Sequence, residues 1–205
     1  YGKQGNWVIP NLPPLSCGEI PWRTYAGEWC EIGNKIVTPF YEIEFDYDGS
    51  IKSLYDKELD REWTNGEFNK LKLYKDNPGV YDAWDILPDY KDKELSLNIS
   101  VPLHFVTADG ETAEFSVTHS TEKCLWERKI RFFRSSRKIE VENIVDWKEF
   151  HRLVKVAFNC NILTRELVCD TGAGFIKREM HRNTSWQRAR FECCHHKWCD
   201  MAEQG

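Results

Sequence analysis

The sequence contains no apolar run long enough to span a membrane and no block of basic residues. A transmembrane helix needs about 20 consecutive apolar residues, so we expect no membrane partner. Nucleic-acid binding needs a concentrated basic face, whereas Lys and Arg are scattered here and the net charge is −5. We therefore expect no nucleic-acid partner either. The N-terminus also lacks the charged-then-apolar arrangement of a signal peptide.

The composition is typical of a globular protein. Hydrophobic residues make up 41% and charged residues 30%, which argues against disorder. With 205 residues, the chain can form one large all-β domain or two small domains. Aromatic residues reach 14%, with nine Trp, and such rings suit strand faces, sugar-stacking platforms or both.

Apolar residues nowhere recur convincingly at helical spacing over three turns, whereas alternation is common. Tyr41, Ile43 and Phe45 alternate with Glu, and Asp48-Gly49 then predicts a hairpin turn before a strand at 51–55. Further strands are predicted at 95–106, 113–118, 125–134, 138–147, 153–158 and 191–198. Short strands separated by turn signals at intervals of about ten residues indicate an all-β fold, an antiparallel β-sandwich.

The first 33 residues differ from the rest in their content of proline and glycine. They include Pro10, Pro13, Pro14, Pro21 and Gly33. Proline at this density excludes a central strand or a helix interior. We predict an irregular linker or edge segment at 1–33 and a β-sandwich domain at 34–205.

The eight cysteines show no paired spacing. Cys193 and Cys194 are adjacent, so on a strand their side chains would point to opposite faces. We predict reduced, mostly buried thiols in a cytoplasmic protein, and treat the sequons at Asn98 and Asn183 as chance matches. Residues 193–199 superficially suggest zinc, but the sequence has no Cys-x-x-Cys and no second cluster. Buried strand residues, and no metal ligand, are predicted there.

A polar and aromatic cluster lies at 77–86. Asp82 and Asp85 stand three residues apart and flank Trp84. Glycosidases use two carboxyl groups with aromatic walls around the sugar, so this pair is a candidate acid and base. The alternative is that both carboxylates bond backbone groups at a turn, and this arrangement is common in loops. The residue types alone therefore favour the turn.

A second cluster lies at 181–186. It combines a cation, an amide, two hydroxyls and an indole, the groups that recognise sugar hydroxyls. The alternative, a polar loop that caps the sandwich, is favoured by the residue types alone. Gly172-Ala173-Gly174 is predicted to be a turn, since no phosphate-binding context surrounds it. A nucleophile elbow is also absent.

Four segments of the sequence carry a resemblance to a known family: 49–58, 77–86, 145–156 and 181–192. In order and spacing they resemble the C-terminal half of the family 38 glycoside hydrolases, in the bacterial, vacuolar and cytosolic α-mannosidase branch. The resemblance covers residues 34–203. It implies a β-sandwich of the galactose-mutarotase-like type (a super-sandwich), packed behind a catalytic domain.

The resemblance also implies a division of labour. The family hydrolyses terminal α-linked mannose with retention, using an aspartate nucleophile and a zinc ion held by His and Asp. Those residues lie outside the matched region, so we expect no catalytic residue, metal ligand or cofactor in this chain, and zinc in the missing catalytic domain. The family continues beyond this chain with further strands. The resemblance therefore implies a sandwich that is incomplete at its C-terminus, with unpaired edges that favour a homo-oligomer.

We expect an accessory domain of a retaining α-mannosidase that completes the mannose pocket, inactive by itself, with α-mannosides and the parent protein's catalytic domain as partners. The predicted substrate-binding residues are Tyr81, Asp82, Trp84 and Asp85, then His181, Arg182, Asn183 and Trp186. One alternative is a free-standing carbohydrate-binding module. A mutarotase-like epimerase ranks last, because His104 and His119 lack an obvious catalytic context and fold does not fix function.

Overall fold

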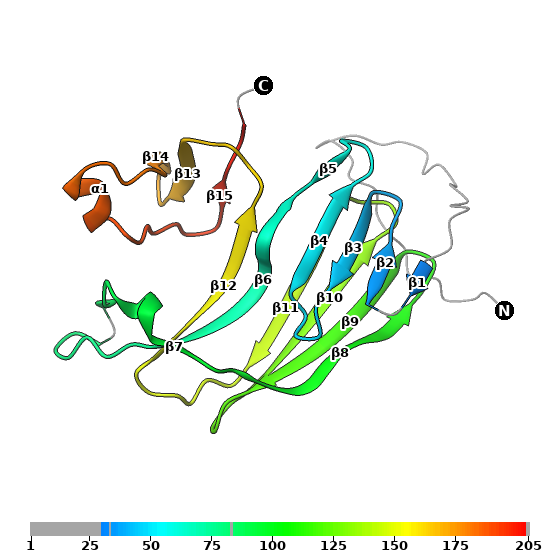
Figure 1. Ribbon diagram of the computed structural model, residues 1–205, viewed down its shortest axis with the longest axis horizontal. Coiled ribbons are helices and arrows are strands. Elements are labelled where there is room, and N and C mark those ends of the chain that lie inside the picture. The colour runs from blue at the N-terminus through cyan, green and yellow to red at the C-terminus, as the bar shows by residue number, and fades with distance from the viewer. Residues whose placement is uncertain (1–29, 33, 83, 204–205) are drawn as a thin grey trace.

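The computed structural model describes residues 30–32, 34–82 and 84–203 (Figure 1). Three antiparallel sheets account for its strands. The largest sheet has the order β1-β2-β3-β4-β6-β12. Two short strands also belong to it: β5 pairs with β4, and β7 pairs with β6. Its strands are β1 (Cys30–Ile32), β2 (Lys35–Val37), β3 (Tyr41–Phe45), β4 (Ile51–Asp56), β5 (Arg61–Glu62), β6 (Thr64–Lys75), β7 (Glu94–Leu95) and β12 (Arg152–Cys160).

The second sheet has the order β11-β10-β9-β8 and the third has the order β14-β13-β15. Their strands are β8 (Asn98–Ala108), β9 (Thr112–Ser120), β10 (Leu125–Phe133), β11 (Ile139–Val145), β13 (Glu166–Thr171), β14 (Gly174–Glu179) and β15 (Cys199–Asp200). A 3-10 helix, η1 (Tyr90–Lys93), and a short helix, α1 (Ser185–Ala189), complete the described elements. No helix in the described ranges is long and apolar enough to cross a membrane.

The hydrophobic core lies between the first two sheets, which overlap in Figure 1. Ile43 and Phe45 of β3 point inward because the strand alternates, and both are buried. The Phe45 ring lies 5.2 Å from that of Phe115 on β9 and 5.9 Å from that of Phe132 on β10, measured between centroids. Two antiparallel sheets that face each other across such a core form a β-sandwich, so the predicted fold class is confirmed.

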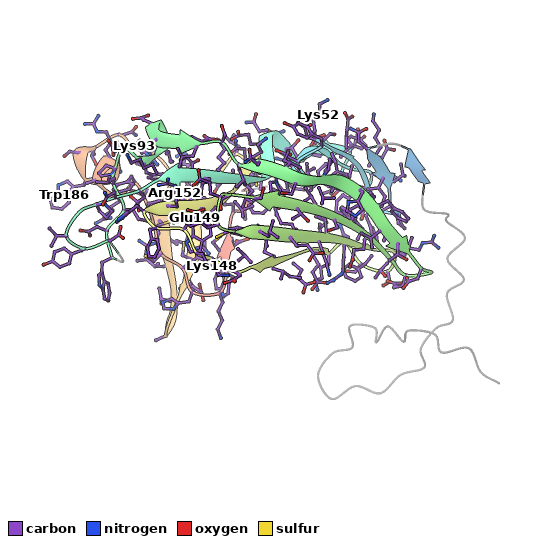
Figure 2. The ribbon with its side chains drawn as sticks, turned by 90° about the horizontal axis from the view of Figure 1, so that it is seen from below. Lys52, Lys93, Lys148, Glu149, Arg152 and Trp186 are labelled. Atoms are coloured by element: carbon purple, nitrogen blue, oxygen red, sulfur yellow. The ribbon has the colours of Figure 1, made fainter. Side chains whose placement is uncertain are left out.

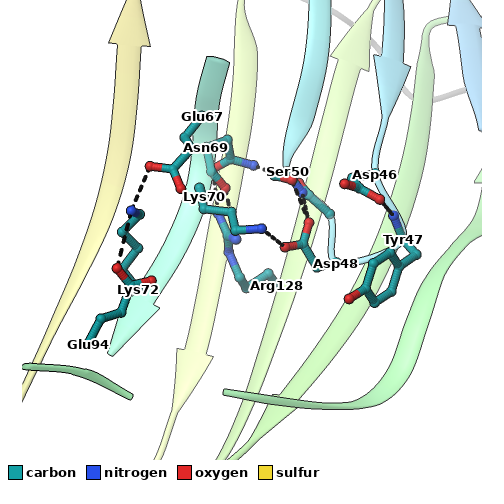
Figure 3. A network of polar contacts seen from close by, with 11 residues as sticks. Asp46, Tyr47, Asp48, Ser50, Glu67, Asn69, Lys70, Lys72, Glu94 and Arg128 are labelled. Atoms are coloured by element: carbon teal, nitrogen blue, oxygen red, sulfur yellow. Dashed lines mark hydrogen bonds and ion pairs between the residues drawn. The ribbon is translucent and has the colours of Figure 1, made fainter. Parts of the chain in front are cut away.

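A buried polar network crosses this core (Figure 3). The fully buried Arg128 of β10 donates to the backbone oxygen of Asn69 (3.1 Å) and to its side-chain oxygen. Beside it, Asp48 accepts hydrogen bonds from Ser50 N (2.9 Å) and from Lys70 Nζ (2.5 Å). Asn69 adopts a left-handed backbone with φ 54°, and the pairing of β6 with β12 shifts register at this residue.

The hairpin predictions of the middle of the chain agree with the structure. The predicted pair 125–134 and 138–147 corresponds to β10 and β11, which pair from Trp126↔Val145 to Phe132↔Ile139. The predicted 95–106 strand instead divides between two sheets, because β7 pairs with β6 and β8 pairs with β9. The 12-residue strand β6 was not predicted, although Lys70 to Leu73 alternate within it.

The predicted strand at 191–198 is wrong. This segment is irregular, and only Cys199–Asp200 pairs with β13. The reason is the carboxylate of Asp170, whose Oδ1 accepts the backbone N–H groups of His196 (2.7 Å), Lys197 (2.9 Å) and Trp198 (3.2 Å). Donors held by this carboxylate are not available to a strand ladder.

Within the predicted linker or edge segment at 1–33, the structure describes only β1, which lies at the edge of the first sheet. The four prolines and Gly33 lie outside the described residues, and the boundary at 33/34 stays a prediction. At the other end of the chain, Arg61 of β5 forms an ion pair with Glu203 (2.6 Å, Nη1 to Oε2). This pair attaches the region around the third sheet to the largest sheet.

Candidate functional site

The first predicted cluster lies on the connection between β6 and η1, which we call the 77–89 loop. Gly79 has φ 89°, and the backbone oxygen of Tyr81 accepts the N–H groups of Trp84 (2.9 Å) and Asp85 (2.9 Å). The loop therefore contains a tight turn that begins at Tyr81, and Gly79 before it has a positive φ that favours glycine. This turn presents its aromatic side chains to solvent: Tyr81 is 62% exposed and Trp84 is 87% exposed.

The 77–89 loop is attached to the turn that precedes β12. Asp82 Oδ2 lies 3.2 Å from His151 Nδ1. His151 has φ 53°, and its backbone oxygen accepts the N–H of Asp76 (3.0 Å). The Asp76 carboxylate in turn accepts the N–H of Leu87 (3.2 Å). Asp82 is thus partnered with a histidine of a neighbouring turn, while Asp85 contributes its backbone to the turn at Tyr81.

A partly buried group of polar side chains connects the end of the 77–89 loop with the segment that follows α1. Glu192 accepts hydrogen bonds from Tyr90 Oη (2.6 Å) and from Lys155 Nζ (2.5 Å). Tyr90 is 1% exposed and packs on Tyr74 with ring centroids 5.0 Å apart. Burial, together with the hydrogen bond to Glu192, raises the pKa of Tyr90 well above its usual value. Lys155 and Tyr90 counter the effect of burial and lower the pKa of Glu192, so this carboxylate is charged.

The second predicted cluster includes the start of the short helix α1, whereas the residue types alone favoured a polar loop there. Thr184 is the N-cap: its hydroxyl accepts the N–H of Gln187 (3.3 Å), and the Gln187 side chain accepts the N–H of Thr184 (2.8 Å). Gln187 also donates to Glu179 (2.6 Å). The Thr-x-x-Gln spacing is a capping box, so the sequence did carry a signal for this helix. Trp186 lies on the helix and is 76% exposed.

A pocket of about 570 Å³ opens between β14 and the segment around α1. His181 and Arg182 of the predicted set line it, together with Arg178, Arg190 and Glu192. Asn183 and Trp186 are not among the lining residues. The pocket therefore combines guanidinium, imidazole and carboxylate groups, which hydrogen-bond to hydroxyls and to anions.

The two clusters lie at the same end of the molecule. In Figure 1, the 77–89 loop and α1 both lie at the left, and Figure 2 shows Trp186 at that end. Among the described residues, the side-chain hydrogen bonds that connect the two regions run through Tyr90 and Glu192. Residue types alone did not indicate this connection, because the two partners are 102 residues apart.

Residues 36–205 match the model of the glycosyl hydrolases family 38 C-terminal domain. The chain belongs to this family. Alpha-mannosidase G of Dictyostelium discoideum is 31% identical over 97% of this chain and 18% of its own length. Alpha-mannosidase 2C1 of Homo sapiens is 29% identical over 67% of this chain and 13% of its own length. The family predicted from the four ordered segments is confirmed.

The fold of this family 38 domain also has a solved counterpart. An alpha-mannosidase from Enterococcus faecalis superimposes with a TM-score of 0.58 at 9% identity, over 75% of this chain and 20% of that structure. At this identity the similarity shows the fold alone. The chain spans less than a fifth of the length of the two curated relatives.

The described residues of this family 38 domain do not fit a metal ion. No group of three or more His, Cys, Asp or Glu among them could hold one. The prediction of buried strand residues at 193–199 is wrong, because Cys193, Cys194 and Cys199 are exposed and the segment is irregular as far as Trp198. These exposed cysteines do not form a closed set of metal ligands. Among the described residues, six cysteines are free thiols: Cys124, Cys160, Cys169, Cys193, Cys194 and Cys199.

Proposed function

We propose that this family 38 domain forms one wall of a mannoside pocket, whose catalytic groups belong to the rest of the parent α-mannosidase. Family membership and the names of the relatives support an α-mannosidase as the parent. The observation that carries the proposal is the exposure of Trp84 and Tyr81 on a loop that is otherwise fastened by hydrogen bonds. Large aromatic rings held at an end of a domain indicate a contact surface.

The two clusters offer complementary groups to a sugar. Tyr81, Trp84 and Trp186 present apolar ring faces, which suit the C–H faces of a pyranose. The remaining predicted residues carry carboxylate, guanidinium, imidazole and amide groups, which bond hydroxyls: these are Asp82, Asp85, His181, Arg182 and Asn183. Their proposed role is to orient the sugar, which lowers the barrier for groups supplied by the catalytic domain.

We place zinc, the nucleophile and the acid/base of the retaining reaction in the catalytic domain. In this scheme the present chain orients hydroxyls and excludes water, and zinc held by the catalytic domain would supply charge stabilisation there. The chain by itself should then not hydrolyse an α-mannoside. Turnover by the isolated 205-residue chain, measured with an aryl α-mannoside and zinc, would contradict this division.

The test of the pocket wall is kinetic and uses the full-length protein that contains this chain. Trp84→Ala should lower kcat/KM for an aryl α-mannoside by roughly 10- to 100-fold, which corresponds to about 1.4–2.8 kcal/mol of lost transition-state stabilisation. Trp84→Phe should retain part of the activity, because a ring face remains. Tyr47→Ala is the matched control: Tyr47 is 67% exposed but lies in the β3–β4 hairpin, beside Leu103 of β8. An equal effect of Trp84→Ala and Tyr47→Ala would exclude the proposal.

A free-standing carbohydrate-binding module is the second candidate, favoured by the exposed indoles of Trp84 and Trp186. Calorimetric titration of the chain with mannose and mannobiose separates the two functions. Tight binding by the chain alone that is lost in Trp84→Ala would favour the module. Weak or absent binding by the chain, with the kinetic effect in the full-length protein, supports the pocket wall.

Self-association and a cytoplasmic location also stay proposals. The strands β8 and β11 form the edges of the second sheet, and β11 carries Ile144 and Val145, which are 45% and 39% exposed. Unpaired strand edges with exposed apolar residues can pair with another copy. Light scattering of the chain should therefore show a dimer or larger species, and a clean monomer would contradict this expectation.

A further inference from the structure

Cys169 and two cysteines more than 20 residues later in the chain, Cys193 and Cys199, come together at the third sheet. Cys169 of β13 is fully buried and lies opposite Cys199 of β15 in the antiparallel register. The N–H of Asp170 donates to the backbone oxygen of Trp198 (3.2 Å). This bond flanks the pair, so Cys169 and Cys199 occupy a non-hydrogen-bonded position, where opposite Cα atoms are about 4.5 Å apart and side chains share one face.

A third thiol also reaches Cys169. Burial and the neighbouring Cys169 thiol raise the pKa of Cys193. Cys193 and Cys199 are both exposed residues. Cys194, the neighbour of Cys193, is exposed but has no such contact among the described residues; its backbone oxygen accepts from Arg178 (3.4 Å). A buried thiol therefore lies between two accessible thiols. Metal binding does not account for the group, as no metal-holding set exists among the described residues.

We propose that Cys169 and Cys199 are a redox modification site, at which a hydroperoxide forms a reversible cross-strand disulfide. The Cα separation expected at this position falls within the range of about 4.4–6.8 Å that disulfides span. Cys199 is the better placed partner because β-pairing fixes its backbone, whereas Cys193 lies on the irregular segment that precedes β15.

The reaction proceeds in two balanced steps. The Cys199 thiol loses its proton to water, and the thiolate attacks the terminal oxygen of the hydroperoxide. The O–O bond breaks, Cys199 becomes a sulfenic acid, and the leaving alkoxide takes up a proton from water and departs as an alcohol (hydrogen peroxide gives water). The Cys169 thiol then gives up its proton, and its sulfur attacks the sulfenic sulfur. The S–S bond forms, the S–O bond breaks, and the departing hydroxide takes up the proton that Cys169 released and leaves as water. Two thiols are oxidised by two electrons and one hydroperoxide is reduced.

The bridge would fasten β15 to β13. The chain between these strands carries β14, α1 and the residues that line the 570 Å³ pocket, so oxidation restricts the movement of one predicted cluster. Burial raises the pKa of the Cys199 thiol above its usual value. The thiolate is the reactive form, so oxidation should be slow at neutral pH and should become several-fold faster as the pH rises from 7 to 9.

Peptide mapping tests the site on the 205-residue chain. The protein is treated with hydrogen peroxide, quenched with N-ethylmaleimide, digested and examined by mass spectrometry. We expect a cross-linked peptide pair that contains Cys169 and Cys199, lighter by two hydrogen atoms than the separate peptides and released by dithiothreitol. The wild-type result does not depend on any variant's ability to fold.

Two variants fix the assignment. Cys199→Ser should abolish the cross-link and leave Cys169 reduced, whereas Cys194→Ser, an exposed thiol of the same segment, should leave the cross-link unchanged. A wild-type bridge between Cys169 and Cys193 would overturn the assignment of Cys199. Complete alkylation of Cys169 after peroxide treatment and unfolding would overturn the site itself.

Discussion

Replacing Arg128 by methionine tests the buried polar network of the sandwich. Methionine keeps much of the side-chain length but donates no hydrogen bond. The substitution removes the donors to the backbone oxygen and the side-chain oxygen of Asn69, and the bond from Arg128 Nε to Asn143 Oδ1 (3.2 Å). Asn69 is 1% exposed, so water does not replace the two lost bonds, whereas Asn143 is exposed and can bind water.

The expected loss of stability comes from the two oxygen atoms of Asn69, which lose their hydrogen-bond donors. Each buried acceptor without a partner costs about 1–3 kcal/mol. The variant also avoids the cost of burying the guanidinium, which is visible in the pKa of Arg128, since burial lowers it to about 10. We therefore expect Arg128→Met to lower the free energy of unfolding by about 2–4 kcal/mol.

Urea unfolding followed by tryptophan fluorescence measures this change. Arg131→Met is the matched control on the same strand, because Arg131 is half-buried and pairs with Glu114 (2.5 Å) and Glu142 (2.7 Å) near the surface. Such pairs contribute about 0–1 kcal/mol. If Arg128→Met is no more destabilising than Arg131→Met, the network is not a stabilising part of the fold. An additive effect of Arg128→Met and Asn69→Gly would also argue against their coupling.

Two further changes probe other parts of the chain. Burial, reinforced by nearby Arg128, lowers the pKa of His119 from 6.5 to about 4. Between these two pH values His119 is protonated in the unfolded chain and neutral in the folded chain. As the pH falls from 6.5 to 4, the free energy of unfolding should drop by about 3 kcal/mol. His119→Gln should make the urea midpoint less dependent on pH over this range. An unchanged pH dependence in this variant would refute the prediction. Asp170→Ala should speed amide exchange at His196–Trp198, whose N–H groups its carboxylate accepts, while Asp170→Asn should retain part of the protection. Equal exchange in all three proteins would show that the carboxylate does not hold the segment.

Local patterns were sufficient for the hairpins of the middle of the chain. The alternation of Tyr41, Ile43 and Phe45 predicted β3, and the Asp48-Gly49 turn predicted its return as β4. Each depends on residues that are neighbours in sequence, so its signal is complete within a short window. The same holds for β10 and β11, whose turn lies between two alternating segments.

The errors arose where distant residues decide the structure. The segment 191–198 has the composition of a strand, but Asp170, more than 20 residues away, takes its backbone donors. The strand β6 contains Asn65, Gly66 and Asn69, residue types that are unfavourable in strands. Asn69 has a left-handed backbone, and its backbone oxygen accepts a hydrogen bond from Arg128 of another sheet. Neither partner is visible in a local window.

The candidate site shows the same division. The two clusters could be selected from residue types and from the resemblance, whereas their arrangement at one end depends on packing. Tyr90 and Glu192, which connect the two regions, have no motif of their own. A hydrogen bond between residues 102 positions apart follows from the fold rather than from spacing.

A structure of the full-length protein with a bound mannoside would test the central claim most directly. The account predicts that the Trp84 indole or the Tyr81 ring lies within about 4 Å of the sugar, the distance at which apolar groups are in contact. The 77–89 loop should then form part of the pocket wall opposite the catalytic carboxylates. A sugar bound with that loop, and the 181–186 segment, facing solvent on another side of the protein would contradict the account.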